Sequence, residues 1–129
     1  MSNQTLRPRG QILGAVLALC LTSFAGAQEV PASVTAAIKK AEAGIAWIIR
    51  QPDDKRTFDN TLGAMDRIQA RMNRETNLTV FMQFVSPDAA TRDAARAGDE
   101  AISSWGIALS KNEAMFKAMK AYENASCPV

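Results

Sequence analysis

The side chains that most often carry out catalysis are scarce in this sequence. Its 129 residues include no histidine, which excludes a serine–histidine–aspartate triad, a cysteine–histidine pair and an imidazole general base. It also excludes the HExxH motif, in which two histidines one helical turn apart hold zinc and the glutamate acts as the base. No glycine-rich phosphate loop and no CxxC motif occurs. We therefore assign no catalytic, cofactor-binding or metal-binding residue.

Two pairs of neighbouring carboxylates remain, and we interpret both as solvent-exposed surface. They are Asp53-Asp54 and Asp99-Glu100. Adjacent residues on a helix point in different directions, so neither pair is placed to converge on one substrate atom. Charged side chains of this kind are also rarely fully buried.

Thioether sulfur is the other chemistry that the sequence offers, because methionine is a soft ligand that suits copper(I). Met65 and Met72 are one heptad apart within an apolar stripe, and no M-x-M cluster occurs. We therefore predict that the methionines fill the core, where a flexible thioether packs well. The five in question are Met65, Met72, Met82, Met115 and Met119.

The beginning of the chain has the features of a secretory signal peptide. Arg7 and Arg9 precede an apolar run over residues 12–27, which ends in an A-x-A arrangement. The run is short for a bilayer span of ~20 residues, which favours a cleaved signal over an uncleaved membrane anchor. We expect residues 1–27 to be removed and the mature protein to be periplasmic or secreted.

The charge of the expected mature chain, residues 28–129, is balanced. Loss of the two arginines leaves 13 of the 15 Lys and Arg residues, against 13 Asp and Glu. Bulk charge then attracts neither nucleic acid nor an anionic membrane. Cys20 leaves with the signal and Cys127 remains alone, which excludes an internal disulfide and a thiolate metal site in the mature chain.

The pattern of apolar residues predicts one all-α domain with three to four long antiparallel helices. The first is expected from Pro31 to about Arg50, because apolar residues recur there at steps of three and four. Thr57 is predicted to cap a second helix of close to thirty residues, with a kink or break near residues 75–79. Its apolar stripe is expected to include Phe58, Leu62, Met65, Ile68, Met72, Leu78, Phe81 and Val85.

Two further capping sequences divide the second half of the chain. Ser86-Pro87-Asp88 predicts a helix start with a capping hydroxyl, a proline at the first position and an acid in the first turn. Asp88 is expected to pair with Arg92 one turn on. The stretch from Ser110 to Glu113 has the form of a capping box, so either this helix bends there or a fourth begins. The buried side of the third helix is expected to contain Ala94, Gly98, Ala101, Ile102, Trp105 and Leu109.

Two stretches resemble the thimet oligopeptidase family of zinc metallopeptidases, which includes thimet oligopeptidase, neurolysin, oligopeptidase A and peptidyl-dipeptidases. Residues 57–68, TFDNTLGAMDRI, resemble the family's T-F-E-N-T-L-x-A-L segment. Residues 84–122 resemble its valine-serine-(proline) turn, the arginine-alanine pair that follows and the next helix. Together the resemblance covers roughly residues 34–122 and implies the N-terminal helices that wall and cap the substrate channel.

The family's HExxH motif, further glutamate ligand and catalytic histidine and tyrosine have no counterpart in these 129 residues, so no site residue is carried over. We expect residues 28–129 to be the helical N-terminal segment of a truncated or partial exported oligopeptidase, inactive alone. Zinc is implied only for the full-length family, and short peptides are implied as partners. We also expect self-association through exposed apolar helix faces. The alternative is a self-standing exported helical module that binds a peptide or partner protein without catalysis.

Overall fold

The computed structural model describes residues 29–126, which form four α-helices and one short 3-10 helix and contain no β-strand. The predicted all-α class is therefore confirmed. The expected signal peptide, residues 1–27, and Cys127 lie outside the described residues. The helices are α1 (Ala32–Ile49), η1 (Asp53–Lys55), α2 (Leu62–Val85), α3 (Ala89–Ser110) and α4 (Glu113–Ser126).

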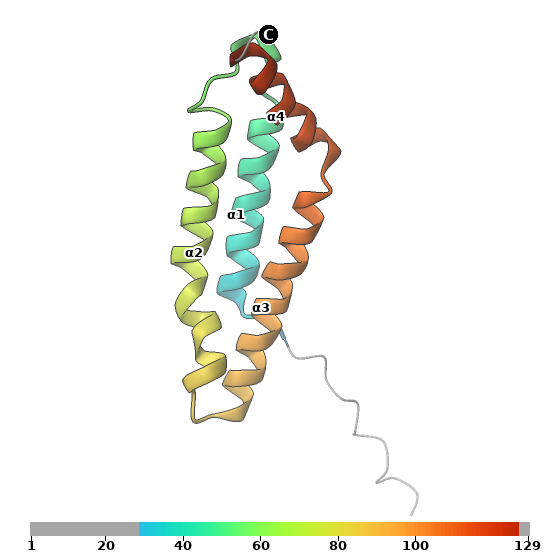
Figure 1. The fold of residues 1–129 in the computed structure, drawn as a ribbon. Helices are drawn as coiled ribbons and strands as arrows, with labels where there is room; N and C mark the ends of the chain where they lie inside the picture. The colour runs from blue at the N-terminus through green and yellow to red at the C-terminus, as the bar shows by residue number, and fades with distance from the viewer. Residues whose placement is uncertain (1–28, 127–129) are drawn as a thin grey trace, which may run out of the picture.

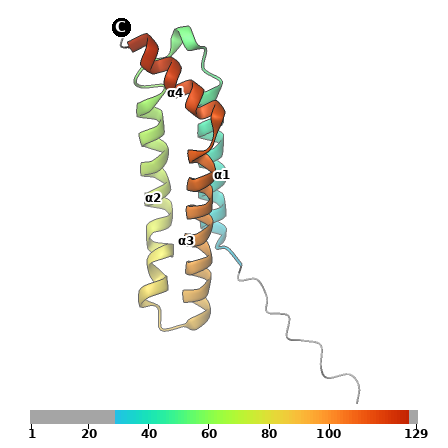
Figure 2. The same ribbon diagram turned by 45° about the vertical axis from the view of Figure 1, so that its right-hand side comes forward.

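The three longest helices lie side by side, and the chain reverses direction between α1 and α2 and again between α2 and α3 (Figure 1). The fourth helix crosses the end of the bundle where α1 finishes and α2 begins, in contact with α1 and η1 (Figure 2). At the opposite end, α2 and α3 extend beyond the start of α1, so two helices lie there instead of three. Within residues 29–126, no helix has both the length and the apolar character needed to span a bilayer.

Two clusters of buried side chains form the core. One, near α4, joins Ile45, Ile48, Ala64 and Met115. The other, nearer the middle of the bundle, joins Ala37, Ala41 and Met72, and the side chains of Ile68 and Trp105 contact both clusters. Burial along α1 follows steps of three and four, as its sequence predicts, because one face of the helix lies against the other helices.

Two glycines allow α1 to approach its neighbours closely. A Cβ atom on Gly44 would lie 2.7 Å from Cδ1 of Ile68 on α2. A Cβ atom on Gly98 of α3 would lie 3.1 Å from Cγ2 of Val34 on α1. Gly98 is thus buried at a helix contact, as expected for the small residues at the beginning of α3.

The start of α2 differs from the prediction, since Thr57 does not cap the helix. The Thr57 hydroxyl accepts a hydrogen bond from the Asn60 N–H (3.3 Å), and the Asn60 side-chain oxygen accepts one from the Thr57 N–H (2.8 Å). This reciprocal pair joins the two ends of the segment 57–60, and the Phe58 carbonyl accepts from the Thr61 N–H (3.3 Å) to close a turn over residues 58–61. The α2 helix begins only at Leu62. The capping chemistry predicted at Thr57 is therefore present, but it lies before the helix.

Of the kink or break predicted near residues 75–79, a break does not occur, because α2 is one continuous helix. The helix runs from Leu62 to Val85, and the hydroxyl of buried Thr76 donates to the Met72 carbonyl at 2.8 Å. This bond satisfies a polar side chain within the helix, so a mediocre helix former is accommodated without a break.

The caps of α3 and α4 are also shifted from the predicted residues. Asp88, and not Ser86, caps α3, and the Arg92 guanidinium donates to the carbonyls of Ser86 (2.8 Å) and Pro87 (3.0 Å) without an ion pair to Asp88 among the described residues. A fourth helix begins instead of a bend, and its cap is Asn112, whose side-chain oxygen accepts from the Met115 N–H at 2.9 Å.

Arg56, in the connection after α1, is hydrogen-bonded to the C-terminal end of that helix. The Arg56 guanidinium donates to the carbonyls of Ile48 (3.0 Å) and Ile49 (3.4 Å) and pairs with the Asp53 carboxylate (2.8 Å). Carbonyls at a helix C-terminus have no partner within the helix, and a cation there is favourable. The Arg56 side chain is 3% exposed, so the cation is held inside the fold.

The Asp88 cap predicts how stability changes at low pH. Hydrogen bonds from the Thr91 hydroxyl (2.6 Å) and the Thr91 N–H (2.8 Å) hold the pKa of the Asp88 carboxyl below its ordinary value of 3.8. A lowered folded pKa adds stability that is present above pH 3.8 and lost as the pH falls through the folded pKa. We expect Asp88→Ala to lower the melting temperature at neutral pH, and Asp88→Asn to restore most of it.

The pH dependence separates charge from capping geometry. The melting temperatures of the wild type and Asp88→Asn, measured by circular dichroism, should converge as the pH falls below 3.8. A constant difference across that range would show that the Asp88 charge adds nothing.

Candidate functional site

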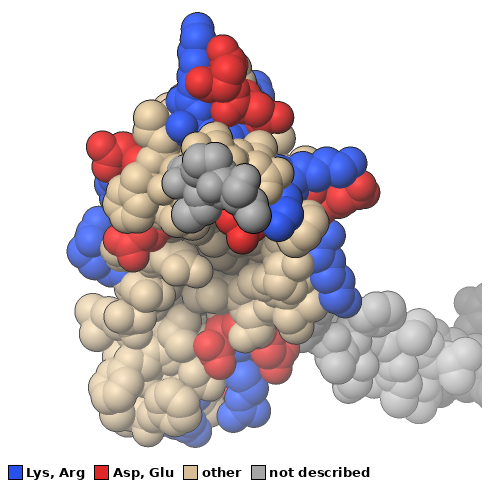
Figure 3. Space-filling view, turned by 45° about the horizontal axis from the view of Figure 1, so that its top comes forward, with Lys and Arg blue, Asp and Glu red and all other residues tan. Residues whose placement is uncertain are grey.

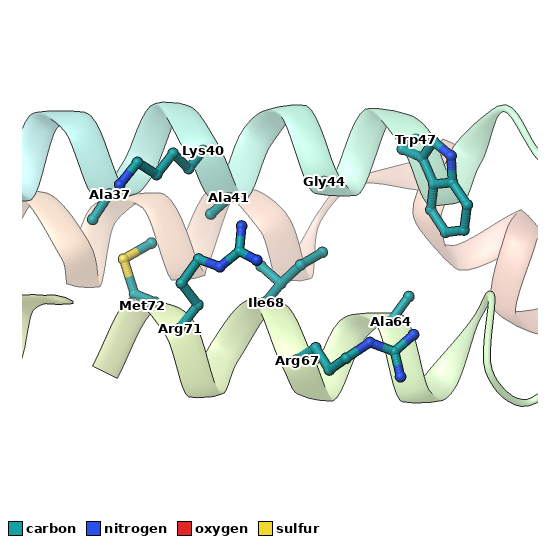
Figure 4. A pocket seen from close by; sticks show the side chains of 10 residues that line it. All are labelled: Ala37, Lys40, Ala41, Gly44, Trp47, Ala64, Arg67, Ile68, Arg71 and Met72. Carbon is teal, nitrogen blue, oxygen red and sulfur yellow. The ribbon is translucent and has the colours of Figure 1, made fainter. Parts of the chain in front are cut away.

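An open groove lies between α1 and α2 (Figure 4). Its volume is about 220 Å³. Small residues allow the two helices to lie close together, and the groove is the space left over these small residues. The lining residues are Ala37, Lys40, Ala41, Gly44, Trp47, Ala64, Arg67, Ile68, Arg71 and Met72.

The charged side chains that line the groove are all cationic. Arg71 reaches from α2 toward α1, while the Trp47 ring extends from α1 toward α2 (Figure 4). Lys40 pairs with the Glu75 carboxylate at 2.9 Å, and Arg67 donates to the Asp59 carbonyl at 2.6 Å. Within residues 29–126, Arg71 makes no hydrogen bond or ion pair. The groove therefore presents guanidinium donors next to an apolar floor.

A second groove lies between α1 and α3 and is mainly apolar. Its volume is about 250 Å³, and its lining includes Ile45, Ile49, Trp105 and Leu109. Glu42 and Asn112 are its polar members. It has no lysine or arginine, so it offers no partner for an anion.

The C-terminal half of α2 carries an exposed apolar surface, which we call the α2 apolar stripe. Its members are Leu78, Phe81, Phe84 and Val85. Leu78 and Phe84 are 75% and 74% exposed, and the Phe81 and Phe84 rings contact each other at a centroid distance of 6.4 Å. Residues 76–87 include no charged residue, and Figure 3 shows a broad uncharged area at the lower left, over this end of the molecule.

The sequence analysis placed Leu78, Phe81 and Val85 in one apolar stripe and expected exposed apolar helix faces, and all three side chains are exposed. Phe58 and Leu62, predicted for the same stripe, are exposed as well, at 60% and 42%. Beyond Thr79, whose hydroxyl lies 3.3 Å from that of Ser33 at the start of α1, α2 has only α3 beside it (Figure 1). Because only α2 and α3 pack together at this end, apolar side chains on their other faces stay exposed to solvent.

The carboxylate pairs lie on the surface, as predicted. Asp53, Asp54, Asp99 and Glu100 are all exposed, and Asp53 is engaged by Arg56. No three His, Cys, Asp or Glu residues within 29–126 are grouped so that they would hold a metal ion.

The methionines contribute to the core, as predicted. Met72 and Met115 are buried, Met65 and Met119 pack against the cluster near α4, and Met82 is half-buried. The prediction of core packing is confirmed for Met65, Met72, Met115 and Met119.

Sequence reasoning missed the cationic groove. Arg67 and Arg71 are one helical turn apart on α2, and Lys40, Gly44 and Trp47 recur at steps of four and three on α1. These spacings place each set on one face of its helix. The signal was available, but it required the pairing of the two faces across helices, which the sequence alone does not give.

Comparison with known proteins relates part of the chain to an oligopeptidase. The chain is 36% identical over 78 residues to a thimet-like oligopeptidase of Dictyostelium discoideum. The matched stretch is 60% of this chain and 11% of that protein, so the chain spans about a ninth of its relative's length. No model of a protein family matches the chain, and no solved structure matches it. The partial match supports a relation to this family of peptidases.

Proposed function

We propose that this chain is the N-terminal helical part of a thimet-oligopeptidase-like peptidase and helps to wall the channel that admits short peptides. The observation that carries the proposal is the 36% identity over 78 residues to the Dictyostelium discoideum protein. The zinc site of the whole enzyme would come from residues other than these, because the sequence has no histidine. The role of this part is then to shape the entrance and hold the peptide.

The exposed apolar side chains support a place within a larger helical assembly. Large apolar residues gather in the α2 apolar stripe, and Phe116 on α4 is also 67% exposed. Contiguous apolar surface rimmed by polar residues is typical of an interaction site. In the proposed arrangement, other helices of the peptidase would cover the stripe.

An exchange of segments tests the proposal. In the Dictyostelium discoideum protein, the matched 78 residues would be replaced by the aligned residues of this chain. We expect the chimaera to cleave a fluorogenic peptide in a chelator-sensitive reaction, because equivalent helices would fill the same place. The control is the same protein with the segment deleted, which should lack this activity. A chimaera no more active than the deletion variant would contradict the proposal.

The self-standing helical module remains the second candidate, and the closed core near α4 favours it. Side chains from α1, α2, α3 and α4 meet in one cluster, including Ile48, Ala64, Trp105 and Met115. A bundle that buries such a cluster without further helices is able to present its grooves to a peptide or a partner protein. Purified residues 28–129 should then bind a ligand but show no chelator-sensitive cleavage of peptides with added zinc.

We further propose that the protein is exported with cleavage after Ala27. The support is the sequence of the first 27 residues, in which Arg7 and Arg9 precede an apolar run that ends in A-x-A. Mass spectrometry of the protein from cells should give an N-terminus at Gln28. Protein that retains Met1 in the membrane fraction would contradict export with cleavage and favour an anchor.

A further inference from the structure

We propose that the groove between α1 and α2 binds the C-terminal carboxylate of a short peptide. The choice of a carboxylate follows from the side chains of the groove itself. The choice of a peptide as the molecule that bears it rests on the proposed relation to oligopeptidases.

The charge of the groove favours an anion. Three cationic side chains and no acidic one belong to its lining. One of the three cations, Lys40, is paired with the Glu75 carboxylate at 2.9 Å. Arg67 and Arg71 lie four residues apart on α2 and both line the groove, but Arg67 points along α2 toward Ala64 whereas Arg71 points toward α1 (Figure 4). Arginine presents several N–H donors in a planar fork that matches a carboxylate.

Arg71 is the side chain that we assign to the carboxylate. It extends across the groove toward α1, and it makes no hydrogen bond or ion pair among the described residues (Figure 4). Arg67 already donates to the Asp59 carbonyl, which fixes its side chain near the same groove. The Arg71 guanidinium is thus available for a ligand, whereas the Arg67 guanidinium is engaged at the other end of the groove.

The apolar part of the groove suits the side chain of a terminal residue. Trp47 is 45% exposed and faces the groove, and Ile68 forms part of the floor opposite Gly44. The volume of about 220 Å³ is below the range of a pocket for a drug-sized ligand. It is therefore suited to the last one or two residues of a peptide, with the rest of the peptide in solvent.

Titration of the ¹⁵N-labelled protein with the tripeptide Ala-Ala-Leu tests the proposal by nuclear magnetic resonance. We expect the free acid to shift the Trp47 indole signal and the amide signals around Gly44 and Arg71. The C-terminal amide of the same peptide should bind at least roughly tenfold more weakly, since one charge-assisted interaction is lost.

Two matched substitutions on α2 locate the interaction. Arg71→Gln should weaken binding of the free acid by roughly tenfold, with the remaining spectrum unchanged. Arg74→Gln removes the same charge from an exposed position on the same helix outside the groove and should leave binding nearly unaffected. Equal losses in the two variants would show that only general charge acts, and would overturn the proposal.

Three further outcomes would also overturn it. They are equal binding of the free acid and the amide, equal shifts with an internal glutamate in an amidated peptide, and the absence of any shift. The titration and the chimaera experiment test different proposals. An active chimaera, combined with no peptide binding at the groove, would reject the carboxylate site and leave the proposed function standing.

Discussion

Replacement of Ile48 by alanine should lower the free energy of unfolding by about 2–5 kcal/mol, the usual range for truncating a large buried aliphatic residue. The Ile48 side chain is 0% exposed and lies in the cluster with Ile45, Ala64 and Met115. Truncation leaves a cavity between α1, α2 and α4 that neighbouring helices fill only partly. Domains of this size have a total stability of ~5–15 kcal/mol, so this loss would be a large share.

Urea unfolding followed by circular dichroism measures the effect, and Ile107→Ala is the matched control. Ile107 is 57% exposed on α3, so the same change in side-chain type should cost no more than about 0.5 kcal/mol. A loss for Ile48→Ala as small as that for Ile107→Ala would show that the cluster near α4 is not a packed core.

The second large effect concerns association. Purified residues 28–129 should self-associate or melt broadly, because the α2 apolar stripe lies in solvent. A large apolar side chain left in water forgoes ~1.5–3 kcal/mol of burial free energy, and the stripe contains four such side chains: Leu78, Phe81, Phe84 and Val85. Association through this surface would recover part of that free energy.

Substitution of two of these residues should reverse the association. We expect Phe81→Ser with Phe84→Ser to remain monomeric, in sedimentation velocity, at concentrations where the wild type associates. Phe116→Ser changes a side chain that is 67% exposed on α4, far from the stripe in sequence, and should not have this effect. A monomeric wild type with a sharp melt independent of concentration would contradict the prediction and favour the self-standing module.

The extent of the helices could be predicted from the sequence where one physical signal determines it. The start and end of α1 follow from apolar steps of three and four and from Pro31 and Pro52. At the start of α2 two signals compete. Thr57 and Asn60 have the residue types of a helix cap, but their hydrogen bonds to each other join the ends of the segment 57–60 instead.

Burial was harder to predict than helix position. Leu78, Phe81 and Val85 have helical spacing and apolar character, and all three side chains are more than half exposed. Spacing identifies which side chains share a face. It does not say whether another element covers that face, which depends on the relative lengths and positions of α1, α2 and α3. The cationic groove was missed for the same reason, since it exists only where the lining residues of α1 and α2 lie opposite each other.

Because α2 and α3 extend beyond the start of α1, we also expect the two ends of the bundle to differ in how easily they unfold locally. Residues near the turn at Ser86 and Pro87 are held by one helix–helix contact and by local hydrogen bonds. Residues near Ile48 are held by all four helices. Backbone amides at the first end should therefore exchange their hydrogens through local fraying, and those at the second only through global unfolding. The apolar stripe lies on the part of the molecule that adjusts its shape most readily, so a partner that docks there would also order it.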